Sequence, residues 1–99
     1  PDGSELLLYV CSAGENPRSR ILQIITSLRS KGIECETDFL GRSVKSQMKE
    51  ADRMKAKYVI VLGDNEIESN SAEIKSMFDG SVKKIEGLDK IINYLKDED

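Results

Sequence analysis

The sequence predicts a single α/β domain: a five-stranded mixed sheet with three helices. Two runs without a charged residue, Leu6–Cys11 and Tyr58–Leu62, have the length and composition of strands buried on both faces. Segments with apolar residues at helical spacing separate the predicted strands, which is the pattern of a sheet covered by helices. A chain of 99 residues forms one core and leaves no room for a second.

The first helix is predicted to begin after the loop Ser12–Glu15. Asn16 is suited to the N-cap and Pro17 to the first helical position. Gly32 is suited to the left-handed residue that follows a helix end. Between them lies one apolar stripe at helical spacing, formed by Ile21, Ile24, Ile25 and Leu28.

The next strand is predicted over residues 33–38, where apolar or small residues alternate with Glu34, Glu36 and Asp38. A strand with one acidic face belongs at the edge of a sheet. Ser43 then predicts the cap of a second helix that ends near Lys55. Its buried stripe is predicted to be Val44, Met48 and Ala51, and a cationic stripe runs beside it, formed by Lys45, Lys49 and Arg53.

The last part of the chain predicts a hairpin and a third helix. Residues 64–70 are polar and predict a turn or a short helix. Residues 72–78 alternate as a strand, the dipeptide Asp79-Gly80 predicts a two-residue hairpin turn, and Ser81–Ile85 returns as a short strand. The closing helix is predicted from Leu88, Ile91, Ile92 and Leu95.

Right-handed crossovers predict that the first three strands are parallel in the order 2-1-3, with their helices on opposite faces. The acidic strand then occupies the edge. A ligand is expected in the crevice beyond the carboxyl ends of the first and third strands, between the Ser12–Glu15 loop and the Gly63–Glu66 loop.

The predicted domain covers residues 5–96, with residues 1–4 as a linker remnant and 97–99 as an acidic end. Because the chain starts at Pro1, we interpret it as a piece of a longer or processed protein. No apolar run has the length of a membrane span, and no secretory leader is visible. The two cysteines do not resemble a disulfide framework, which favours a reducing, cytoplasmic compartment.

Catalytic chemistry is restricted by the absence of histidine, which excludes imidazole acid–base catalysis and histidine-activated nucleophiles. Two cysteines cannot supply a four-ligand zinc site. Cys11 ends a central strand, as in phosphate-cradling phosphatases, but the arginine needed six residues later is replaced by Pro17. The carboxylates of Asp64, Glu66 and Glu68 are compatible with a divalent ion or with a solvated turn.

The net charge of −3 hides an uneven distribution. Residues 42–57 contain six basic and two acidic residues, so this stretch carries a charge of +4 and the rest of the chain −7. Exposed lysines often serve only solubility, but a basic helix can also bind the phosphate groups of a nucleic acid. We therefore predict two groups of residues that bind nucleic acid. Arg42, Lys45 and Lys49 would contact phosphates, and Gln47, Glu66 and Lys75 would read bases.

A series of short motifs across the chain supports this prediction. Lys45-x-Gln47, Ala51-Asp52 and Leu62-Gly63-Asp64-x-Glu66 stand in order within the segments 41–53 and 56–66. The series resembles the anticodon-binding domain of class IIa aminoacyl-tRNA synthetases, above all that of bacterial histidyl-tRNA synthetases. The resemblance runs from about Glu5 to Lys96 and includes the order of the elements.

The resemblance implies a domain that holds the anticodon stem and loop of a tRNA and carries no catalytic residue, cofactor or metal. It implies a parent enzyme, expected to be a homodimer, whose separate catalytic domain uses ATP and magnesium to charge tRNA with histidine. Glu66 falls where relatives contact anticodon bases, and Lys75 where related enzymes carry an arginine. Two departures are Ser46, where a second lysine is common, and the tip Phe78–Ser81, which lacks the usual glutamine. An alternative is a protein-interaction or regulatory module of the same fold.

Overall fold

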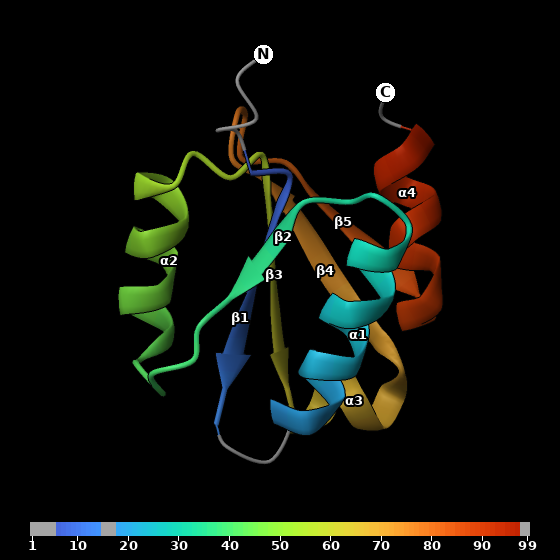
Figure 1. Ribbon diagram of the computed structural model, residues 1–99, viewed down its shortest axis with the longest axis horizontal. Coiled ribbons are helices and arrows are strands. Elements are labelled where there is room, and N and C mark those ends of the chain that lie inside the picture. Colours follow the sequence, from blue (N-terminus) through green and yellow to red (C-terminus); the bar gives the residue numbers. More distant parts are fainter. Residues whose placement is uncertain (1–5, 15–17, 98–99) are drawn as a thin grey trace.

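The sheet of this chain is mixed and five-stranded, as predicted. The computed structural model describes residues 6–14 and 18–97, and within them the strand order is β2-β1-β3-β4-β5 (Figure 1). The parallel strands β1 (Leu8–Ala13), β2 (Cys35–Thr37) and β3 (Tyr58–Gly63) have the predicted order 2-1-3. The antiparallel strands β4 (Ser71–Ser76) and β5 (Val82–Glu86) extend the sheet beyond β3.

The helices cover the two faces of the sheet unequally. α2 (Val44–Arg53) lies alone on one face, whereas α1 (Arg18–Ser30) and α4 (Ile91–Asp97) lie on the other (Figure 1). The predicted placement of the first two helices on opposite faces is therefore confirmed. α3 (Asp64–Ser69) is the short helix that the polar segment after Gly63 allowed. The predicted cap at Asn16 and Pro17 lies outside the described residues.

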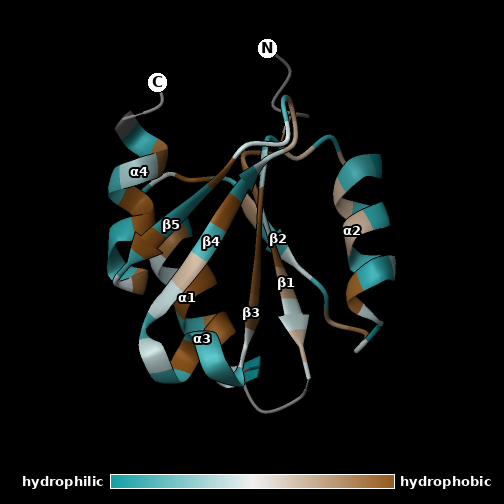
Figure 2. Ribbon diagram, turned by 180° about the vertical axis from the view of Figure 1, so that it is seen from behind, coloured by the Kyte–Doolittle hydropathy of each residue, from teal (hydrophilic) through white to brown (hydrophobic). Residues whose placement is uncertain are grey.

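Two apolar layers hold the sheet between the helices. The larger layer lies under α1 and α4 and contains the predicted stripe of α1, all of it buried. The smaller layer lies under α2 and joins Ala51 to Tyr9, Cys11 and Val59 of the central strands. β3 is hydrophobic along most of its length in Figure 2, as a strand covered on both faces requires. On the α2 side, however, the exposed residues Lys75, Val82 and Lys84 leave part of β4 and β5 open to solvent.

The hairpin between β4 and β5 corrects one prediction. Ser76 N donates to Ser81 O at 2.8 Å and Gly80 N donates to Ser76 O at 2.9 Å, so the loop spans residues 77–80 rather than Asp79-Gly80 alone. Gly80 has a φ of +77°, a left-handed value that glycine adopts without strain. Phe78 therefore leaves the strand, and its side chain is 96% exposed instead of continuing the alternation.

The final helix begins differently from the prediction. Residues Leu88–Lys90 form a 3₁₀ turn, and α4 follows directly from Ile91. Leu88, Ile91 and Leu95 are buried as predicted. Among the described residues, no helix is both long enough and apolar enough to cross a membrane.

Candidate nucleic-acid interface

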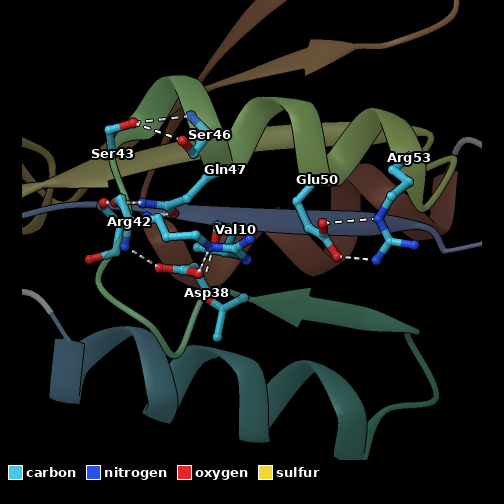
Figure 3. Close-up of polar contacts among 10 residues, drawn as sticks. Val10, Asp38, Arg42, Ser43, Ser46, Gln47, Glu50 and Arg53 are labelled. Atoms are coloured by element: carbon cyan, nitrogen blue, oxygen red, sulfur yellow. Dashed lines mark hydrogen bonds and ion pairs between the residues drawn. The ribbon is translucent and has the colours of Figure 1, made fainter.

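The first turn of α2 is fixed by the cap that the sequence predicts. Ser43 has an extended backbone, and its Oγ accepts a hydrogen bond from Ser46 N at 3.2 Å (Figure 3). This bond satisfies one of the amide groups that a helix start leaves without an intrahelical partner. The cap sets where α2 begins and which of its side chains face the sheet.

Gln47 does not have the position of a base-reading residue, which corrects the prediction. Its side chain is fully buried. Gln47 Oε1 accepts from Ser12 N at 2.7 Å, and Nε2 donates to Ser12 O at 2.9 Å and to Arg42 O at 2.7 Å. The amide has no remaining donor for a ligand, because both Nε2 hydrogens are used. Gln47 instead fastens the start of α2 to the end of β1.

The reason for this bond lies in the length of β2. The register of β2 against β1 ends at the pair Val10–Thr37. Thr37 Oγ1 donates to Val10 O at 2.7 Å, and beyond it the backbone of Ser12 on that side of β1 has no strand beside it. A buried backbone group without a partner is costly. The Gln47 amide, which can both donate and accept, replaces the missing strand at Ser12.

Arg42 pairs with a buried carboxylate. Its Nε donates to Asp38 Oδ1 at 2.8 Å and its backbone N donates to Asp38 Oδ2 at 2.9 Å, while the Asp38 side chain is 1% exposed (Figure 3). Burial alone raises the pKa of Asp38, but the hydrogen bonds from Arg42 and Leu40 outweigh it and hold that pKa below its ordinary value. The charge of Arg42 is thus largely balanced, although no described residue hydrogen-bonds its terminal nitrogens.

Arg53 is also paired. Its guanidinium makes two contacts with the carboxylate of Glu50, one of them from Nε to Oε1 at 3.0 Å. Figure 3 shows this pair on the same side of α2 as Asp38. The two arginines of the basic stretch therefore lie on the flank of α2 that faces β2, each beside an acid.

The lysines of the predicted stripe lie elsewhere on α2, with Lys45 on the opposite flank and Lys49 on the side that faces solvent. Met48 lines a hollow over β3–β5, and Asp52, one turn later, lines a second hollow with residues of the β4–β5 hairpin. Lys45 is three residues before Met48 and belongs to this flank, whereas Lys49, four residues before Arg53, projects away from the sheet into solvent. Both are exposed, and no described carboxylate forms an ion pair with either.

The hollow beside this flank has a volume of about 480 Å³. Its floor is apolar, from Val59 and Val61 of β3 and Ala72 of β4, with Met48 of α2 as one wall. Its polar lining comes from α3, β4 and β5. These residues are Glu66, Ser71, Glu73, Lys75 and Lys84.

The structure therefore brings the predicted Glu66 and Lys75 into one hollow. Lys75 lies opposite Val59 on β3 and Val82 on β5, which places its side chain on the open face of the sheet. Glu66 Oε1 accepts from Gly63 N at 2.8 Å, so one carboxylate oxygen caps α3. Gly63 allows this approach, because a Cβ there would lie 3.2 Å from that oxygen.

The place of the hollow differs from the expected one. It lies over the face of β3–β5 beside α2, rather than beyond the carboxyl ends of β1 and β3. Sequence reasoning had named Met48 only as a core residue and had not named Val82 or Lys84 at all. Lys84 was detectable, because it lies opposite Glu73 and so shares the face of Lys75 in an antiparallel hairpin.

The phosphatase reading of Cys11 is not supported by its surroundings. The residue is fully buried, and burial, with a smaller contribution from Asp38, raises the pKa of its thiol to about 12. A nucleophilic cysteine needs a populated thiolate and access to substrate. Within residues 6–14 and 18–97, no group of three or more carboxylate, cysteine or histidine side chains is arranged to hold a metal ion.

The chain is similar to known proteins over nearly its whole length. Residues 8–98 match the family model described as the anticodon binding domain. The chain is 43% identical over 91 residues to the histidine–tRNA ligase of Macrococcus caseolyticus, covering 92% of this chain and 21% of that protein. It is 38% identical over 95 residues to that of Lysinibacillus sphaericus, covering 96% and 22%.

A solved structure shows the same arrangement. The apo histidyl-tRNA synthetase of S. aureus superimposes with a TM-score of 0.89 at 37% identity, covering 95% of this chain and 24% of that one. The chain thus spans about a fifth to a quarter of the length of the relatives that it matches.

Proposed function

This chain belongs to the anticodon binding domain family, and from that membership we propose that it binds the anticodon stem and loop of a tRNA as the non-catalytic C-terminal domain of a histidine–tRNA ligase. The observation that carries the proposal is an open hollow containing Glu66 and Lys75 beside α2, whose exposed Lys45 and Lys49 form no ion pair with any described residue.

The hollow has the chemistry that single-stranded RNA recognition uses. An unstacked base presents a flat apolar face and a hydrogen-bonding edge. The valines and Met48 offer an apolar surface to the face. The second carboxylate oxygen of Glu66 can accept from an amino or imino group of the edge, and the ammonium of Lys75 can donate to a carbonyl or ring nitrogen. Directed groups of opposite sign in one hollow discriminate between bases.

The lysines of α2 supply the sequence-independent part of the affinity. Lys45, on the Met48 flank, and Lys49, on the solvent side of α2, are exposed and have no carboxylate partner among the described residues, so they can contact phosphates without breaking an ion pair. Arg42 contributes through its terminal nitrogens, with Asp38 balancing part of its charge. Gln47 holds the first turn of α2, and with it Arg42, in place.

The remaining chemistry belongs to the parent protein. Its catalytic domain would use ATP and magnesium to activate histidine and charge the tRNA, and the parent would act as a homodimer in the cytoplasm. This domain would contribute binding alone, with no cofactor of its own. Because the catalytic domain holds the same tRNA, the anticodon contact becomes intramolecular, and a modest affinity of the isolated domain suffices.

The test is the affinity of the chain for an anticodon stem-loop as a function of salt concentration. Each single-stranded phosphate contact contributes about −0.7 to the log–log slope, so two lysine contacts give about −1.4 and a third contact from Arg42 gives about −2.1. A slope near zero would reject the proposed phosphate contacts.

A matched pair of variants locates the contacts. Lys45→Ala removes a charge without an ion pair among the described residues from the flank of α2 that carries Met48, whereas Arg53→Ala removes an ion-paired charge from the other flank of the same helix. We expect Lys45→Ala to weaken binding severalfold and to reduce the slope by about 0.7, with little change for Arg53→Ala. The reverse order would place the RNA on the β2 side of α2.

A further inference from the structure

The β4–β5 hairpin presents an aromatic side chain to solvent. Phe78 is 96% exposed, more than any other large apolar side chain in the described part of the chain. The loop around it is held by hydrogen bonds: Phe78 N donates to Ser76 Oγ at 3.2 Å, and Ser81 N donates to Asp79 Oδ1 at 2.9 Å. Met77, the preceding residue, packs against the apolar layer under α2. The tip is thus anchored on one side while its phenyl ring has no contact to bury it.

A hollow of about 460 Å³ adjoins the ring. Its other walls come from the end of α2, the turn into β3 and the hairpin. These walls include both apolar and charged groups, a mixture that is usual in protein–protein interfaces. The lining residues are Asp52, Lys55, Ala56, Lys57, Tyr58, Ser76, Met77 and Phe78.

The first described residues of the chain are fastened at this same end. Lys57 N donates to Leu6 O at 3.0 Å, and Met77 N donates to Lys57 O at 2.9 Å. These two bonds join the start of the domain, the α2–β3 turn and the hairpin in one row. The described part of the chain therefore begins, at Leu6, at the end of the sheet where the hairpin lies. Figure 1 shows the hairpin and the start of β1 at the same end of the sheet.

We propose that Phe78 and the hollow beside it form the docking surface for the preceding part of the parent polypeptide. The inference rests on the proposed function, because the relatives match this chain with only their C-terminal fifth. The partner surface is expected to offer an apolar socket for the phenyl ring of Phe78, surrounded by polar groups. A single aromatic anchor is sufficient, because the covalent connection at Leu6 keeps the partner at a high effective concentration. The surface is separate from Lys75 and Glu66, which line the other hollow.

Amide hydrogen exchange at residues 78–80 tests this proposal, measured in the 99-residue chain and in the full-length protein that contains it. We expect exchange at least tenfold slower in the full-length protein. Phe78→Gln should abolish that difference. Leu22→Gln, which changes a 40% exposed side chain on α1, is the matched control and should preserve it.

Three outcomes would overturn the docking surface. Equal exchange in the two proteins would show that nothing covers the tip. Protection that grows with the concentration of the 99-residue chain would assign the surface to a second copy. Protection that requires an added anticodon stem-loop would assign it to RNA. Stem-loop affinity is measured separately on the 99-residue chain, so loss of RNA binding with retained protection would reject the proposed function and leave the docking surface standing.

Discussion

Replacing Gln47 tests whether this side chain is a positioning residue. Gln47→Met keeps an unbranched side chain of similar length but removes all three hydrogen bonds to Ser12 and Arg42. Each buried backbone group left unpaired costs about 1–3 kcal/mol, and the added apolar burial recovers about 1–2 kcal/mol. With three such groups the cost is about 3–9 kcal/mol, so we expect a net loss of at least about 1 kcal/mol in the free energy of unfolding, measured by urea titration.

Gln47→Glu gives a second, sharper result. The carboxylate can accept from Ser12 N, but it would face the carbonyl oxygens of Ser12 and Arg42, which the native amide donates to. Burial and these oxygens would raise the pKa of the new carboxyl group in the folded state above its unfolded value of about 4.3. A raised folded pKa destabilises the fold above it, so the variant should recover part of its stability as the pH falls from 7 to 5.

The control is Lys49→Met, an exposed position on the same helix, which should change stability by less than about 0.5 kcal/mol. If Gln47→Met lowers the free energy of unfolding by no more than the control does, the hydrogen bonds of Gln47 to Ser12 and Arg42 are not a source of stability. A Gln47→Glu variant whose deficit relative to the native chain does not change with pH would show that the carboxyl group escapes the two carbonyls.

Three other predictions concern single groups. Hydrogen bonds hold the pKa of Asp38 below its ordinary value, so its contribution to the free energy of unfolding is complete above the unfolded pKa of 3.8 and is lost as the pH falls through the folded pKa. The urea midpoint of Asp38→Asn should therefore lie below that of the native chain at pH 6, and the difference between the two midpoints should be smaller at pH 2.5. Cys11, with a pKa of about 12, should resist iodoacetamide at pH 8 until urea unfolds the chain, and fast labelling of the native chain would contradict its burial. Glu66→Gln keeps an acceptor for Gly63 N, so stability should stay within about 0.5 kcal/mol while discrimination between anticodon loops falls about tenfold; an equal loss for every loop would deny Glu66 a reading role.

Local rules predicted most of the architecture. The Ser43 cap depends on atoms three residues apart, and the stripe of α1 depends on spacing within one helix, so both are visible in the sequence. The strand order followed from crossover handedness, with the acidic β2 at the edge. The hairpin was predicted too short, because the choice between a two-residue and a four-residue loop depends on which pair closes it. Ser76 and Ser81 form that pair here.

The burial of Gln47 was partly predictable and its role was not. Gln47 is three residues after Val44 and four before Ala51, so helical spacing alone places it on the buried side of α2. Its partner Ser12, however, is 35 residues away in sequence, and the need for a side-chain amide arises only because β2 stops at Thr37. Knowledge of three elements in space is required to recognise that need.

The cationic stripe shows how a charge count and a charge geometry differ. The spacing of Arg42 from Asp38 and of Arg53 from Glu50 is that of helical or turn ion pairs, and both pairs form. A phosphate that approached the β2 flank would have to compete with these carboxylates for the same guanidinium groups, or be repelled by them at the edge strand where Glu36 also lies. On the Met48 flank, Lys45 forms no ion pair with a described residue, although Asp52 lies on the same flank and Glu66 and Glu73 line the hollow, with one oxygen of Glu66 engaged in the α3 cap. The two flanks of one ten-residue helix therefore differ in how their cations are engaged, because the arginines of the first are paired with acids whereas the Lys45 ammonium of the second is available to a phosphate.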